Sequence, residues 1–181
     1  EHLSVYDGLK TVQKLNMLTE KKGLPTEQHN HIWEDKQKNT LDMLSDLKVD
    51  SNLLYTISKL SDEGYKIVCC SNSIRKTVLT VLAKLGLIEY MDLILSNEDV
   101  DNSKPHPEMY WKAISKMKHL PEETLIIEDS PYGLLAAARS KSYILRVKNP
   151  QEVTYENIIN KINKVQMGDK QTTPAWRDET L

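Results

Sequence analysis

The sequence predicts an α/β fold in which a parallel sheet is covered by helices on both faces, with a helical segment ahead of it. Short and largely apolar runs alternate with amphipathic helical patterns from residue 65 onwards. Such runs are typical of strands that are buried on both sides. Residues 11–60 show helical periodicity alone, and polar residues follow three of the apolar runs. In a sheet of this kind, residues at the carboxyl ends of the strands form the binding site.

Length and charge narrow the class of protein. The chain has 181 residues, of which 39% are hydrophobic and 28% are charged, and its formal net charge is -2. This length suits one domain, or a core with a small accessory piece. The charge is nearly balanced, and no apolar run approaches the roughly 20 residues that a membrane-spanning helix needs. We therefore expect no nucleic-acid partner and no membrane association.

The two cysteines, Cys69 and Cys70, are adjacent in the sequence. Neighbouring residues on a strand point to opposite faces, so a disulfide between them would be strained. We expect both to be small buried side chains in a reducing compartment, and we expect the protein to be cytoplasmic.

The expected elements follow from periodicity and from helix start and stop signals. Helices are expected over residues 11–22, which Gly23 ends, over 26–47, and from 51 to about 64. Strands are expected over residues 65–70, 91–95, 124–127 and 143–147, with helices after Ser73, from Pro107, around 134–138 and over 153–165. From residue 166 onwards the chain is polar and reads as a poorly ordered tail or a linker.

Ser71, Asn72 and Ser73 follow the first strand. A hydroxyl, an amide and the backbone N–H groups of a helix N-terminus would together bind an anion. The simpler interpretation is that these residues only cap the next helix, with Ser73 at the N-cap.

Lys104 follows the second strand and is succeeded by Pro105 and Pro107. The prolines fix the backbone, so the ammonium group can be held in one direction by a stiff loop. The simpler interpretation is an exposed lysine that is only solvated.

Glu128, Asp129 and Ser130 end the third strand. Two adjacent carboxylates at the end of a buried strand repel each other and lose hydration, which is costly unless a cation compensates. Carboxylate ligands of this kind suit Mg²⁺, which also keeps waters and binds phosphate. The alternative is an acidic pair that the dipole of the following helix stabilises.

The order of these motifs resembles the haloacid dehalogenase superfamily, in particular its β-phosphoglucomutase-like phosphatases and mutases with a small helical cap. The motifs are a strand then Ser-Asn, a strand then Lys-Pro, and a strand then Glu-Asp-Ser-x-x-Gly. The resemblance covers about residues 5–147. It implies a Rossmannoid core over residues 49–165, a partial helical cap over 1–48, and a tail or linker over 166–181.

The resemblance also implies a mechanism. An aspartate at the end of the first core strand attacks a phosphoryl group and forms an aspartyl-phosphate, and a second aspartate two residues later acts as acid and base. Ser71 and Asn72 would then hold the phosphoryl oxygens, and Lys104 would neutralise charge. Glu128 and Asp129 would position Mg²⁺. The implied substrate is a small phosphorylated metabolite.

One motif of that family, an apolar strand followed by Asp-x-Asp-Gly, is absent from the sequence. The only Asp-Gly is Asp7-Gly8, which only Val5 and Tyr6 precede as apolar residues and which falls where the cap is expected. We therefore do not assign Asp7 as the nucleophile. In the family the missing strand lies between the strands that here end at Cys70 and Ile127. The hypothesis is that the chain is a fragment of a longer protein, has a gap one strand wide, and is inactive by itself.

Two functions of different classes remain open from the sequence. The first is a Mg²⁺-dependent phosphatase or phosphomutase, and the second is a non-catalytic member that binds phosphate or serves as a scaffold. An unrelated flavodoxin-like or receiver-like sheet is disfavoured, because neither has a helical cap ahead of the motifs. Lys36 and Lys38 are candidates for reaching a substrate phosphate from the cap. The substrate's identity and the oligomeric state are not specified by the sequence.

Overall fold

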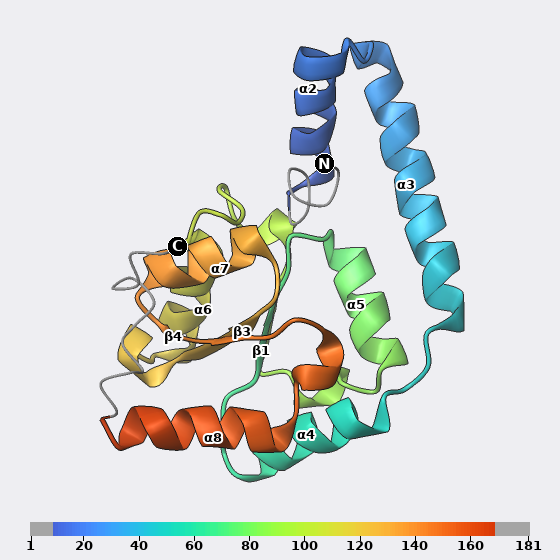
Figure 1. Ribbon diagram of the computed structural model, residues 1–181. Helices are drawn as coiled ribbons and strands as arrows, with labels where there is room; N and C mark the ends of the chain where they lie inside the picture. Colours follow the sequence, from blue (N-terminus) through green and yellow to red (C-terminus); the bar gives the residue numbers. More distant parts are fainter. Residues whose placement is uncertain (1–8, 169–181) are drawn as a thin grey trace.

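The computed structural model describes residues 9–168 and has the predicted α/β organisation (Figure 1). The helices are α2 (Thr11–Lys22), α3 (His29–Met43), α4 (Ser51–Asp62), α5 (Arg75–Lys84), α6 (Glu108–Met117), α7 (Pro131–Ser140) and α8 (Tyr155–Gln166). The strands are β1 (Val68–Cys70), β2 (Leu93–Leu95), β3 (Leu125–Glu128) and β4 (Tyr143–Arg146). Short 3-10 turns join several of them. None of the helices within residues 9–168 is long and apolar enough to cross a membrane.

The strands form two separate parallel pairs rather than one continuous sheet. In one pair Val68 of β1 aligns with Leu93 of β2, and in the other Leu125 of β3 aligns with Tyr143 of β4. Within residues 9–168 no strand joins β1 to β3. Within the described residues β1 and β3 thus each pair with one neighbour alone, and the missing central strand stays a prediction.

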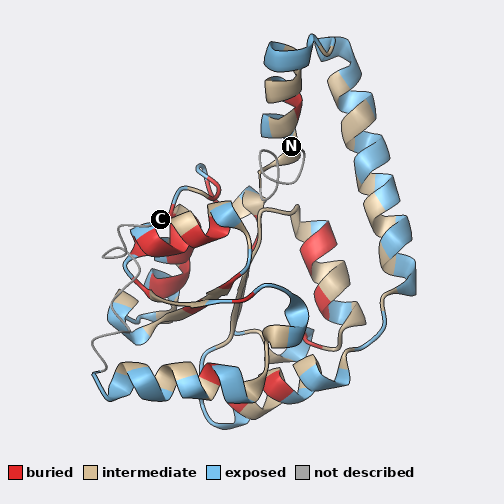
Figure 2. Ribbon diagram, in the orientation of Figure 1, coloured by how far each residue is buried: buried red, intermediate tan, exposed pale blue. Residues whose placement is uncertain are grey.

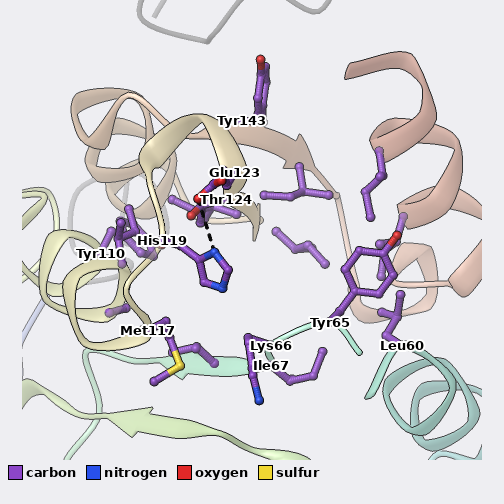
Figure 3. Close-up of a pocket in the computed structure, with 18 of the residues that line it drawn as sticks. Leu60, Tyr65, Lys66, Ile67, Tyr110, Met117, His119, Glu123, Thr124 and Tyr143 are labelled. Atoms are coloured by element: carbon purple, nitrogen blue, oxygen red, sulfur yellow. Dashed lines mark hydrogen bonds and ion pairs between the residues drawn. The ribbon is translucent and has the colours of Figure 1, made fainter. Parts of the chain in front are cut away.

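An apolar cavity of about 510 Å³ lies between β1 and β3 (Figure 3). Side chains from both strands and from α4, α6 and α8 line it, among them Leu60, Ile114, Met117, Ile126 and Ile158. Neighbouring strands lie about 4.8 Å apart, so a gap between two sheet edges can take one more extended segment. An unpaired backbone group that stays buried costs about 1–3 kcal/mol, so both edges would gain stability from a further strand.

Helices cover both faces of the strands, as the sequence predicts. Cys70 packs with buried residues of α6 and α7, whereas Cys69 packs with buried residues of α5 and with side chains of α4. Both cysteines are half-buried and free. Their opposite directions agree with the alternation of side chains along a strand. Figure 2 shows that the buried residues concentrate in α5, α6 and α7.

The helices α2 and α3 form a hairpin that extends away from the strands (Figure 1). Gly23 ends α2 in the left-handed conformation at φ 71°, as predicted, and its N–H donates to the carbonyl oxygens of Leu18 and Thr19. Helix α3 has no buried residue, and Leu15 is the one buried residue of α2. Hydrogen bonds next to both ends of the hairpin join it to the core, from Lys10 Nζ to the Asn97 carbonyl oxygen and from Lys84 Nζ to the Ser45 carbonyl oxygen, each at 3.1 Å. The exposed hairpin thus stands beside the core with few contacts to it.

Several predicted helix boundaries were wrong. Ser73 is not an N-cap, because its N–H donates to Ser71 Oγ and the helix begins later, after Ile74. Helix α4, by contrast, begins at Ser51 as predicted, and Asp50 caps it, since its carboxylate accepts from the N–H groups of Asn52 and Leu53. A side chain in the right place, not the residue type alone, decides which residue caps a helix.

The remaining differences lie at the ends of elements. The segment 26–28 is a 3-10 turn, so α3 begins at His29, and it ends before Leu47. The first two strands are three residues each, shorter than predicted. The Asp7-Gly8 pair and residues 169–181 of the expected tail lie outside the described residues.

Candidate functional site

A polar hollow of about 430 Å³ lies where the hairpin faces the carboxyl ends of β1 and β3. From the core it is lined by Cys70, Ser71, Asn72, Ser73, Lys104, Ile127, Glu128 and Ser130. From the α2–α3 side it is lined by Leu9, Thr11, Lys14 and Lys36. Four of the five predicted site residues therefore converge on one hollow, and Asp129, the fifth, directly follows Glu128.

Ser71 and Asn72 serve different purposes at the end of β1. Ser71 Oγ accepts the N–H of Ser73 at 3.1 Å, and its own hydroxyl hydrogen can still be donated to a ligand. The Asn72 side chain instead holds the backbone of Lys104. Its Nδ2 donates to the Lys104 carbonyl oxygen at 3.2 Å, and its Oδ1 accepts the Lys104 N–H at 3.3 Å. Asn72 therefore positions the lysine loop, and its predicted contact with a phosphoryl oxygen stays a prediction.

Lys104 is buried, with 7% of its surface exposed, so it is not a solvated surface lysine. Its Nζ donates to Glu128 Oε2 at 2.7 Å and to the carbonyl oxygen of Cys70 at 3.1 Å. The ammonium also lies 4.9 Å from the centre of the Tyr110 ring. Lys104 thus connects the end of β1 with the end of β3 across the gap between the two strand pairs.

Both carboxylate oxygens of Glu128 are engaged. Oε2 accepts from Lys104 and from the Tyr110 hydroxyl, the latter at 2.8 Å. Oε1 accepts from the N–H groups of Asp129 and Ser130 and from Ser130 Oγ, at 3.1–3.2 Å. Burial disfavours the charged carboxylate, but the Lys104 ammonium and these hydrogen bonds outweigh it and lower the pKa of Glu128 to about 2. Glu128 is therefore ionised, and Lys104 is its counter-ion.

Gly133 explains the glycine of the Glu-Asp-Ser-x-x-Gly motif. A Cβ atom at this position would lie 2.0 Å from Cδ of Glu128, which no real contact allows. Ser130 caps α7 by accepting the Gly133 N–H at 3.1 Å. The glycine is needed because the first turn of α7 passes directly against the Glu128 carboxylate.

Tyr110 was not identified from the sequence as a site residue. It lies on α6 with 5% of its surface exposed, and burial together with the Glu128 charge raises the pKa of its hydroxyl. The spacing of Met109, Ala113 and Ile114 places Tyr110 at the buried face of α6, so its burial could have been inferred. Its hydrogen bond to Glu128, which is 18 positions away in the sequence, could not.

The carboxylates at the hollow differ in how well they suit the Mg²⁺ that the family resemblance implies. Mg²⁺ is commonly bound by one or two carboxylates together with waters and substrate phosphate. Asp129 is exposed directly after the carboxyl end of β3, so its carboxylate is suited to act as a Mg²⁺ ligand. Glu128 has both oxygens in use, so it fits an orienting role better than direct ligation. Among residues 9–168, no group of three or more His, Cys, Asp and Glu side chains could hold a metal. A Mg²⁺ ion at Asp129 would be completed by waters, by substrate phosphate or by a further carboxylate.

The cysteines at this edge are not nucleophiles. Burial raises the pKa of Cys69, and burial raises the pKa of Cys70 to about 12. The reactive form of cysteine is the thiolate, which such a pKa suppresses near neutral pH.

Residues 1–147 match the sequence model of the haloacid dehalogenase-like hydrolases. The chain belongs to this family. The resemblance inferred from the three motifs is thereby confirmed.

Curated relatives include two proteins named pyrophosphatase PpaX. The one from Halalkalibacterium halodurans is 30% identical over 107 residues, which is 59% of this chain and 46% of that protein. The one from Bacillus pumilus is 36% identical over 84 residues, which is 46% of this chain and 39% of that protein. The chain thus spans less than half the length of these relatives.

Solved structures confirm the predicted HAD-like fold. A β-phosphoglucomutase from Clostridium difficile has a TM-score of 0.74 and 20% identity, with 88% of this chain and 80% of that chain covered. A hydrolase from Pseudomonas syringae has a TM-score of 0.73 and 19% identity, with 90% and 81% covered. At this identity the likeness shows the fold and not the activity.

Proposed function

We propose that the protein is a Mg²⁺-dependent phosphoryl-transfer enzyme, a phosphatase or phosphomutase, that acts on a small phosphorylated metabolite through an aspartyl-phosphate. The observation that carries this proposal is the convergence of Ser71, Lys104 and Glu128 on one polar hollow at the carboxyl ends of the strands. Ser71 and Lys104 can donate hydrogen bonds to an anion, and Glu128 holds the Lys104 ammonium in place.

Lys104 is suited to binding a phosphoryl oxygen. An ammonium group has three N–H donors, and the contacts to Glu128 and Cys70 use two of them. The third can point to a phosphoryl oxygen, with the Ser71 hydroxyl as a second donor. Because Lys104 is held by Asn72 and Glu128 before any ligand arrives, little reorganisation is needed when charge develops on the phosphoryl group.

The nucleophile is proposed to come from an extended segment in the cavity between β1 and β3. Such a segment would pair with both open edges, and its carboxyl end would reach the hollow beside Lys104. An aspartate there would lie next to the ammonium that neutralises it. We expect residues 9–168 to turn over no substrate without this segment.

Mg²⁺ would be held by Asp129 together with that aspartate and the substrate phosphate, with Glu128 orienting the site through Lys104. When bound, the ion reduces the repulsion between a carboxylate nucleophile and a phosphate dianion. The half-buried free thiols suit a reducing compartment, so the proposed location is the cytoplasm.

The test uses protein expressed from the complete reading frame, with Mg²⁺ and a panel of sugar phosphates and pyrophosphate. The pyrophosphate is included because the curated relatives are named pyrophosphatases. Phosphate release indicates a phosphatase, and isomerisation indicates a mutase. If neither is seen across the panel, the enzyme proposal is wrong.

A non-catalytic phosphate-binding member is the second candidate. The observation that favours it is that none of the four strands in residues 9–168 is directly followed by an Asp-x-Asp pair; the pair of Asp99 and Asp101 begins only at the end of the 3-10 turn that follows β2. Thermal stabilisation of the complete protein by phosphate, without turnover of any substrate, would distinguish this function from catalysis.

A further inference from the structure

Tyr110 lies behind the polar hollow and does not line it. Its side chain instead lines the apolar cavity between β1 and β3 (Figure 3). Its hydroxyl donates to Glu128 Oε2 at 2.8 Å, and the same oxygen accepts from Lys104 Nζ at 2.7 Å. A single carboxylate oxygen therefore joins Tyr110 to the group that is proposed to bind the phosphoryl oxygen.

Packing fixes the place of the Tyr110 ring before any ligand is bound. Tyr110 belongs to a buried cluster with Ile126 of β3 and with Ala136 and Ala137 of α7, and 5% of its surface is exposed. The centre of the ring lies 4.9 Å from Lys104 Nζ, within the distance at which the face of an aromatic ring attracts a cation. The tyrosine thus acts on the ammonium in two ways, through its ring and through Glu128.

The hydroxyl occupies an acceptor position of Glu128 that no other described contact fills. Oε2 has two lone pairs, and Lys104 and Tyr110 each donate to this oxygen. Oε1 is engaged by the N–H groups of Asp129 and Ser130 and by Ser130 Oγ. Without the hydroxyl, Oε2 would keep a buried lone pair with no donor, which is unfavourable. The ammonium already in contact with that oxygen would shift towards the vacated side and turn its third N–H away from the hollow.

We propose that Tyr110 is a positioning residue for phosphoryl transfer: its hydroxyl fixes Glu128 Oε2 and thereby holds the third N–H of Lys104 towards the hollow. This inference rests on the proposed function and adds a residue to the same site. A fixed donor contributes most in the transition state, when charge is redistributed over the phosphoryl oxygens. Removal of the hydroxyl should therefore lower kcat and leave KM almost unchanged.

Tyr155 is the matched control for Tyr110. Its hydroxyl also donates to a glutamate, Glu63 Oε1, at 2.6 Å, but that hydrogen bond is exposed, and Tyr155 lines neither the cavity nor the hollow. Y155F therefore removes the same hydroxyl from the same kind of contact. L82V is the control for lost stability, because Leu82 is buried in α5 and also lines neither space.

The first experiment measures kcat and KM of the complete protein with Mg²⁺, using the compound of the sugar phosphate and pyrophosphate panel that is turned over fastest. Rates are referred to the folded fraction, which near-UV circular dichroism gives. Y110F should lower kcat about tenfold and change KM by less than about twofold, a coupling of the size seen between contacting side chains. Y155F and L82V should match the native protein within about twofold. Y110M, which fills the site without a donor, should lose at least as much as Y110F.

The second experiment measures the binding of two inhibitors by calorimetry, again with the complete protein and Mg²⁺. Orthovanadate adopts a trigonal-bipyramidal geometry that resembles the phosphoryl group during transfer, whereas inorganic phosphate resembles the ground state. Y110F should weaken the binding of orthovanadate about tenfold and that of phosphate by less than about twofold. A purely structural role of Tyr110 would weaken the binding of both to the same extent.

The outcomes separate this inference from the function on which it rests. If Y110F keeps the native kcat, or raises KM instead, Tyr110 does not position Lys104, although the phosphoryl-transfer site stands. An equal fall in kcat for Y155F or L82V would assign the loss to stability and would also overturn the inference. If the native protein turns over no compound of the panel and binds neither inhibitor, the proposed function is wrong and the role of Tyr110 falls with it.

Discussion

The positive charges on the two walls of the hollow differ in whether the protein supplies an ion-pair partner. On the core wall, Lys104 is buried and meets Glu128 at 2.7 Å, with the Tyr110 hydroxyl on the same carboxylate oxygen. On the hairpin wall, Lys14 and Lys36 have no ion-pair partner within residues 9–168. The core charge is neutralised by the protein and so shapes the site, whereas the hairpin charges remain available to a ligand.

This difference determines which mutations should reduce folding stability and which should alter binding. Changes on the core wall should reduce folding stability, because they leave a buried group without its partner. Changes on the hairpin wall should alter binding and leave stability almost unchanged.

Lys104→Met should have the largest effect. It leaves the Glu128 carboxylate buried without a counter-ion, and breaking a buried pair in this way costs about 3–5 kcal/mol. Urea unfolding measures the loss. The double variant Lys104→Met with Glu128→Gln should recover part of it, because the uncompensated charge is removed. A single-variant loss below about 1 kcal/mol would show that the pair is not buried as described.

Acid should destabilise the protein through the same pair. The pKa of Glu128 is about 2 in the folded protein, below the usual 4.5, so its contribution is complete above pH 4.5 and is lost as the pH falls towards 2. The loss is at most about 3 kcal/mol. The urea midpoint of the native protein should fall between pH 6 and pH 3, and the midpoint of the Glu128→Gln variant should fall less steeply. Asp99, whose pKa is also about 2, should account for part of the slope that remains.

Gly133→Ala should destabilise by about 2 kcal/mol, because the new Cβ displaces the Glu128 carboxylate. The direction of the change in folding stability is informative, because Gly→Ala inside an ordinary helix stabilises the protein by roughly 1 kcal/mol. Thermal unfolding of the variant measures it. A rise in melting temperature would mean that α7 does not pass against Glu128.

Tyr110→Phe should cost about 1–2 kcal/mol, because it removes a hydrogen bond to a charged acceptor and leaves the ring in place. The neighbouring Trp111→Phe is the control, since Trp111 is 48% exposed and should change stability by under about 0.5 kcal/mol. Equal effects of the two changes in chemical denaturation would argue against the Tyr110–Glu128 contact.

Lys36→Gln should have the smallest effect on stability, a gain of at most about 0.5 kcal/mol, because it removes a charge that has lost some hydration and that repels Lys14. The melting temperature without ligand measures this. A loss above about 1 kcal/mol would mean that Lys36 is held by the protein and is not available to a ligand.

Much of the fold followed from local patterns. Gly23 ends α2 because a left-handed residue without Cβ is needed there, and the alternation of Cys69 and Cys70 gave the two faces of β1. The convergence of Ser71, Lys104 and Glu128 also followed, because the carboxyl ends of parallel strands lie at one edge.

Features that depend on distant side chains were not predictable. The hydrogen bonds of the Asn72 amide to the backbone of Lys104, which lies 32 positions away, were not foreseen, and its contact with phosphate stays a prediction. Lys36 and Lys38 were equivalent candidates in the sequence, and only the docking of the hairpin separates them. The metal roles of Glu128 and Asp129 stay predictions.

Ser71→Ala gives the most direct test of the proposed phosphoryl-transfer site. The change removes a hydroxyl donor without touching the buried Lys104–Glu128 pair, so the protein should stay folded. With the complete protein and Mg²⁺, phosphate release or isomerisation should fall by about 10- to 100-fold, as expected for loss of one donor to the developing charge. Turnover by Ser71→Ala equal to that of the native protein would contradict the account.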